Sequence, residues 1–102
     1  MDTDTQNAVD HIRENIQSLD PYADIYVLPL SGYGYNRETE IYILTPKEID
    51  YAVEQQYVNA RYEAEKFSGQ SFKMYLFNKS DWHQNHIETP IYEKVHNEGI
   101  ML

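Results

Sequence analysis

The chain has 102 residues, enough for one small domain over 1–102, and 41% of them are hydrophobic, which is too many for a disordered chain. Eight basic residues against seventeen acidic ones give a formal net charge of −9, and the cations are scattered, so nucleic acid is not expected as a partner. The absence of cysteine excludes disulfides and thiolate metal sites, and no run approaches the roughly 20 apolar residues of a membrane span, so a cytoplasmic location is expected.

The first elements are predicted from hydrophobic periodicity. Apolar residues at spacings of three and four predict an amphipathic helix over 5–18. Two strands follow, Ile25–Leu30 and Glu38–Leu44, separated by a polar, glycine-bearing loop over 31–37. The first strand is apolar on both faces, as expected of a strand that is covered on two sides.

The segment Thr45-Pro46-Lys47-Glu48 has the pattern of a helix start, with Thr45 as N-cap and Glu48 completing a capping box. The helix is expected to run to Phe67, where Ser68-Gly69 supplies the stop. Its predicted core stripe consists of Ile49, Ala52, Val53, Tyr57, Ala60, Ala64 and Phe67.

The last third of the chain predicts one more strand and two short helices. The strand covers Ser71–Phe77, and Asn78 or Ser80 can cap a helix around Asp81–His86. Thr89-Pro90 opens the final helix. The order helix, strand, strand, helix, strand, helix predicts an α/β sandwich, or an α+β fold if the helices segregate.

Two acids stand at the start of the second strand. Because alternate side chains of a strand share a face, Glu38 and Glu40 point the same way. Two carboxylates at a strand end, just after a glycine loop, can hold Mg²⁺ for phosphoryl chemistry. The same pattern also occurs on solvated strand faces, so the spacing alone leaves both interpretations open.

Three segments carry a resemblance to a known family: ETEIYILTPKEI, MYLFNKSDW and TPIYEKVHNEGIML. They resemble an Asp-x-Asp strand leading into a capped helix, a third strand with its Ser-Lys-acid-acid-Trp continuation, and a closing helix. Over almost its full length the chain is similar to a small bacterial nucleotidyltransferase domain of the minimal type, with a DNA polymerase beta-like fold. The resemblance implies a three-stranded mixed sheet and transfer of a nucleoside monophosphate from NTP, using two Mg²⁺ ions held by three carboxylates.

Each catalytic element departs from that family pattern. Where the family has a Gly-Ser pair, this chain has Pro29-Leu30 or Ser31-Gly32, so the residues left to bind a nucleotide in the loop are Ser31, Gly32 and Gly34. Proline has no N–H to offer a phosphate. The Asp-x-Asp pair has become Glu38-x-Glu40, whose longer side chains move both carboxylates outward.

The third carboxylate of the family is also missing. Lys73 stands about where it would be, and a Lys73 salt bridge to Glu38 or Glu40 could substitute for a metal ion. We therefore expect a catalytically degenerate protein that needs no cofactor. The alternatives are an active Mg²⁺-dependent transferase that uses Glu38 and Glu40 with a third acid such as Glu48 or Asp50, and a protein that binds nucleotide without transfer.

Partner surfaces are suggested by a second stripe on the long helix. Tyr51, Val58 and Tyr62 recur at helical spacing outside the core stripe and predict an interface, either between two copies in a homodimer or with another protein. Minimal nucleotidyltransferases are often antitoxins of all-helical HEPN-type toxins, so the resemblance implies a helical HEPN-type partner. An ordinary helix surface is the alternative.

Histidines near the C-terminus form a weaker candidate site. Asp81, His83 and His86 are close in sequence and could share a metal, although an exposed polar turn has the same pattern. His96 is expected at the surface. Trp82 is expected in the core, packing the last helices onto the sheet.

Overall fold

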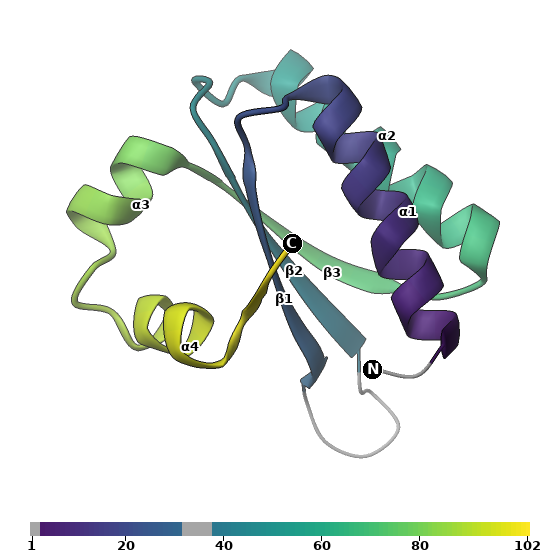
Figure 1. Ribbon diagram of the computed structural model, residues 1–102. Coiled ribbons are helices and arrows are strands. Elements are labelled where there is room, and N and C mark those ends of the chain that lie inside the picture. Colours follow the sequence, from purple (N-terminus) through teal and green to yellow (C-terminus); the bar gives the residue numbers. More distant parts are fainter. Residues whose placement is uncertain (1–2, 32–37) are drawn as a thin grey trace.

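The computed structural model describes residues 3–31 and 38–102, and only the backbone of residues 29–31. The elements in chain order are α1 (Thr3–Leu19), β1 (Asp24–Ser31), β2 (Glu38–Thr45), α2 (Tyr51–Ser68), β3 (Phe72–Asn78), α3 (Lys79–Asn85), α4 (Pro90–Glu98) and β4 (Ile100–Met101). Figure 1 shows three layers, with α1 and α2 side by side on one face of the sheet and α3 and α4 on the other. This is a mixed α/β fold. None of the described helices is both long and apolar enough to cross a bilayer.

The sheet in the described part of the chain has the strand order β3-β2-β1-β4. β1 pairs with β2 and with β4 in antiparallel orientation, whereas β2 and β3 are parallel. The parallel pair requires a crossover, which α2 provides between β2 and β3. The sheet is therefore mixed, as predicted.

The larger core lies between the sheet and the pair α1–α2. Ile12 and Ile16 of α1 and Tyr57 of α2 are fully buried there against Ile41 and Ile43 of β2. These strand residues alternate with a second set that faces α3 and α4. Tyr42 and Leu44 pack there with Trp82 and Val95, both fully buried. The prediction that Trp82 packs the last helices onto the sheet is confirmed.

Several predicted boundaries are confirmed. α1 matches the helix predicted over 5–18, extended by one or two residues at each end. α2 ends at Ser68, and Gly69 caps it with a left-handed backbone (φ 72°), a conformation that glycine adopts without strain. Asn78 caps α3 and Thr89 caps α4, each accepting a hydrogen bond from an amide three residues later.

The predicted start of α2 was wrong. Thr45 is the fully buried last residue of β2, and its hydroxyl donates to Asp20 while accepting from the Lys47 N–H, so it caps no helix. The N-cap is Asp50, whose carboxylate accepts a hydrogen bond from the Val53 N–H at 2.8 Å. Thr45 and Asp50 are each followed three residues later by a residue that could complete a cap. Only Asp50 caps α2, because the Thr45 hydroxyl is engaged by Asp20.

The core stripe of α2 is correspondingly shorter than predicted. Ile49 precedes the helix and is 37% exposed, Ala52 is exposed, and Phe67 is 69% exposed, where it stacks on the His11 ring at 4.2 Å. The buried or half-buried members are the remaining four, Val53, Tyr57, Ala60 and Ala64.

The three-stranded sheet was also incomplete. After Gly99 the chain forms β4, which pairs Ile100 with Val27 and Met101 with Tyr26. The Leu102 N–H then donates to the Ile25 carbonyl at 2.9 Å. This short pairing fixes the C-terminal residues of the described chain along β1.

Candidate nucleotide site

The two acids of β2 lie at the start of the strand, beside the end of β1. Glu38 pairs with Ser31 and Glu40 with Leu28, and the register is irregular between Leu28 and Ser31. By strand alternation Glu38 and Glu40 share the face of Tyr42, which is covered farther along by α3 and α4. Both glutamates are half-buried. Gly32 and Gly34 of the proposed nucleotide loop lie outside the described residues.

Lys73 of β3 is the register partner of Glu40 in the parallel pair. Partners in register project from the same face of a sheet, so the exposed Lys73 and the half-buried Glu40 share one face on neighbouring strands. No ion pair within 4.0 Å joins Lys73 to an acid in the part of the chain that the structure describes. Lys73 is thus on the predicted face, but the close salt bridge that the sequence suggested is not formed among the described residues.

Tyr42 contacts Glu40 from the same strand. The Tyr42 hydroxyl donates a hydrogen bond to Glu40 Oε2 at 2.6 Å, and the Tyr42 ring stacks on Tyr75 of β3 with centroids 4.9 Å apart. Burial, the hydrogen bond to Glu40 and the glutamate charge together raise the pKa of Tyr42. The phenol therefore stays protonated and remains a donor to the carboxylate.

A third carboxylate for this face is not supplied by the candidates named from sequence. Glu48 and Asp50 follow the opposite end of β2, beyond Thr45, which lies five residues or about 17 Å along the strand from Glu40. Asp50 is engaged as the N-cap of α2. β3 contains no acid, and residues 3–31 and 38–102 contain no group of three metal-ligating side chains placed to hold an ion.

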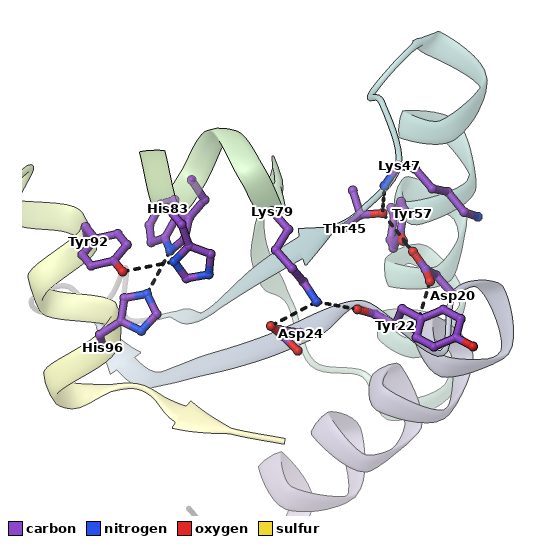
Figure 2. A network of polar contacts seen from close by, with 11 residues as sticks. Asp20, Tyr22, Asp24, Thr45, Lys47, Tyr57, Lys79, His83, Tyr92 and His96 are labelled. Carbon is purple, nitrogen blue, oxygen red and sulfur yellow. Dashed lines mark hydrogen bonds and ion pairs between the residues drawn. The ribbon is translucent and has the colours of Figure 1, made fainter. Parts of the chain in front are cut away.

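The histidine cluster at α3 is arranged differently from the predicted metal site. His86 Nδ1 lies 3.7 Å from Asp81 Oδ2, and its ring stacks on Trp82. His83 instead contacts the Tyr92 hydroxyl at 3.1 Å (Figure 2). Asp81, His83 and His86 therefore do not converge on one point.

His96 was wrongly expected at the surface. It is half-buried, and its Nε2 accepts a hydrogen bond from Trp82 Nε1 at 2.9 Å. Burial, with a smaller contribution from nearby His83, lowers the pKa of His96 and favours the neutral ring that can accept this bond. A single buried tryptophan near a histidine-bearing helix was the available signal, because a buried indole N–H needs an acceptor.

A buried polar cluster around Asp20 was also missed from sequence. Asp20 Oδ2 accepts hydrogen bonds from the Thr45 hydroxyl at 2.9 Å and from the Tyr57 hydroxyl at 3.2 Å, as Figure 2 shows. Its other oxygen accepts from the Tyr22 N–H at 3.0 Å. Burial alone would raise the pKa of Asp20, but these hydrogen bonds and the Lys47 charge hold it below its ordinary value. The Asp20-Pro21 turn was the signal, since aspartate at this position often bonds the amide two residues later.

Comparison of the chain with protein-family models, with curated proteins and with solved structures yielded no match. Membership of a family is therefore a proposal that depends on the sequence motifs. The Asp20 cluster lies on the α1–α2 side and joins three elements, which is a structural role. The face with Glu38, Glu40 and Lys73 remains the candidate for ligand chemistry.

Proposed function

We propose that the chain is a cytoplasmic nucleotidyltransferase-like protein that has lost transfer chemistry and acts through protein contacts. The observation that carries this proposal is Lys73, the register partner of Glu40 at the place where the family pattern requires a carboxylate. An ammonium cannot ligate a metal ion and repels one at short distance. The two-metal chemistry implied by the resemblance would need the opposite charge at this position.

The environment of Glu40 supports the same conclusion. Its Oε2 accepts a hydrogen bond from the Tyr42 hydroxyl at 2.6 Å, and the raised pKa of Tyr42 means that this hydroxyl carries its proton. Mg²⁺ accepts little deviation from an octahedral shell at about 2.0–2.1 Å. A metal ion at Glu40 Oε2 would compete with this hydrogen bond and would lie on the face from which Lys73 projects.

Calorimetric titration with Mg²⁺ or Mn²⁺ in the presence of ATP tests the proposal. We expect no nucleotide-dependent binding in the micromolar range, and the same result for Glu40→Ala. A clear isotherm that is lost in Glu40→Ala and kept in Glu63→Ala, an exposed acid of α2, would establish the active transferase and overturn the proposal.

The partner class follows from the resemblance, which implies an all-helical HEPN-type toxin. An antitoxin that acts by contact needs a binding surface and no carboxylate chemistry. We expect a HEPN-type toxin to be encoded beside this chain, and co-expression of the chain with that toxin should restore growth equally with the parent chain and with Glu40→Ala. Restoration by the parent chain alone, with Glu40→Ala folded but inactive, would indicate that neutralisation requires the transferase site.

A further inference from the structure

β3 lies at the edge of the described sheet. It pairs with β2 on one side, and residues 3–31 and 38–102 place no strand on its other side. Its sequence, FKMYLFN, contains no proline and a single charge. Such an edge is a template for another strand unless proline, charges or a bulge protect it.

The hydrogen bond of Phe72 shows which main-chain N–H groups of β3 point away from β2, toward the unpaired edge. The Phe72 N–H donates to Glu65 Oε2 of α2 at 2.8 Å, and so is turned away from β2. Amides alternate along a strand, so those of Met74 and Leu76 point to the same open side. The β3 edge thus offers the main-chain groups of Met74 and Leu76 for pairing.

A groove between α2 and β3 runs along this edge. It has a volume of about 440 Å³ and is lined by Val58, Glu54 and Arg61 of α2 together with the central residues of β3. One acid and one base give the α2 wall no net charge, in a chain whose total is −9. This is a favourable place for two acidic chains to meet.

The exposed stripe of α2 continues this surface. Tyr51 is 78% and Tyr62 is 59% exposed, and both share the helix face of Val58, which lines the groove. Gln56 and Asn59 lie on another side of α2, where they line a separate pocket between α2 and α1. The stripe therefore faces away from α1, toward the open edge.

The centre of the surface can be located from two positions. Glu65 lies beside Phe72, and α2 runs opposite to β3 because it connects the parallel strands β2 and β3. Seven helical residues rise about 10 Å, the length of about three strand residues, which puts Val58 beside Tyr75. Val58 of α2 and Tyr75 of β3 therefore lie at the same height along the strand direction.

The charges around that level are self-complementary. Glu54 and Arg61 lie on either side of Val58, about one helical turn away in each direction. In an antiparallel pairing of two α2 helices about Val58, Arg61 of one copy meets Glu54 of the other. Arg61 Nε is buried without a hydrogen-bond partner in the described chain, and its ion pair with Glu65 is long, at 3.7 Å.

We propose that the β3 edge and the Tyr51-Val58-Tyr62 stripe bind a second copy of this chain, forming a continuous sheet across a two-fold axis near Tyr75 and Val58. Met74 of one copy then pairs with Leu76 of the other, and each such pair exchanges two main-chain hydrogen bonds. The stripes of the two α2 helices pack on each other above the junction. The dimer uses neither Glu38 nor Glu40, so it is independent of the nucleotide site and goes beyond the function proposed there.

Sedimentation at increasing salt measures the dimer, which should strengthen as the repulsion between two chains of −9 is screened. Glu54→Arg and Arg61→Glu should each weaken it by about tenfold or more, and an equimolar mixture of the two variants should recover much of the affinity, because the reversed charges meet across one half of the interface. Glu88→Arg and Lys94→Glu, which reverse exposed charges outside α2 and β3, are the matched controls and should leave dimerisation close to that of the parent chain.

Hydrogen exchange separates edge pairing from any other dimer. The Met74 and Leu76 amides should become protected as the protein concentration rises, whereas protection in α1 should not change. A monomer at high concentration and high salt overturns the proposal. So does a dimer in which these two amides exchange freely, or one that is indifferent to both charge reversals. A failed dimer would leave the calorimetric test of nucleotide binding unaffected.

Discussion

Glu40 of β2 and Lys73 of β3 are register partners in the parallel pair, and they project from the same face of the sheet. The carboxylate of Glu40 also accepts the Tyr42 hydroxyl. The pair therefore places one negative and one positive group where the resemblance implies a cluster of acids. A change of charge at Lys73 therefore tests the proposal that this face does not bind metal ions.

The substitution Lys73→Asp should create a weak metal site. It removes a repelling charge and places a third carboxylate on the face of Glu38 and Glu40. Because affinity for divalent cations depends on the number and charge of oxygen ligands, Mn²⁺ binding should rise by about tenfold or more over the parent chain. Calorimetry or the Mn²⁺ resonance signal measures the change.

The matched control for this substitution is Lys66→Asp, which makes the same charge change at an exposed position of α2. It should leave Mn²⁺ binding at the level of the parent chain. Equal gains in the two variants would show that net charge, and not the position of Lys73, determines the affinity.

Much of this face could be predicted from the sequence. Period-two alternation puts Glu38 and Glu40 together, and the predicted third strand brings Lys73 to their level. The position of the α2 cap could not be predicted, because Thr45 and Asp50 both have local capping patterns and only the distant Asp20 distinguishes them. β4 was missed for a similar reason. Two apolar residues after a glycine are too few to show a hydrophobic periodicity, and they form a strand only because they pair with β1.

Removal of the Asp20 carboxylate should destabilise the protein. In Asp20→Ala the Thr45 and Tyr57 hydroxyls lose a buried acceptor, and each unsatisfied group costs about 1–3 kcal/mol. We expect a loss of about 3 kcal/mol in the free energy of unfolding, and a smaller loss for Asp20→Asn, which keeps one carbonyl oxygen. Urea denaturation measures both, with the exposed Glu88→Gln as control. A loss for Asp20→Ala no larger than that of Glu88→Gln would refute the structural role of the cluster.

Asp20 should also make stability depend on pH. Its pKa is held below the ordinary value, so the unfolded chain binds a proton more readily than the folded one. The stabilisation is fully present above the unfolded pKa of about 4 and is lost as the pH falls through the lower folded pKa. The difference in unfolding free energy between the parent chain and Asp20→Asn should therefore shrink below about pH 4. A difference that is constant between pH 7 and pH 3 would contradict this expectation.

The Trp82–His96 hydrogen bond predicts a second transition at milder pH. A protonated imidazole donates from both nitrogens, so it cannot accept the Trp82 N–H. Because burial and His83 lower the pKa of His96, the unfolded chain takes up this proton first. The stabilisation is present above the ordinary histidine pKa of about 6.5 and declines as the pH falls below it.

Trp82 is the single tryptophan of the chain, so its indole N–H gives one resonance that reports this bond. We expect the resonance to shift with a midpoint below about pH 6.5, and unfolding to become easier over the same range. In His96→Phe, which keeps a ring against Tyr26 and Tyr92, the shift should disappear. A transition that persists unchanged in His96→Phe would show that the hydrogen bond between Trp82 and His96 does not govern stability in this range.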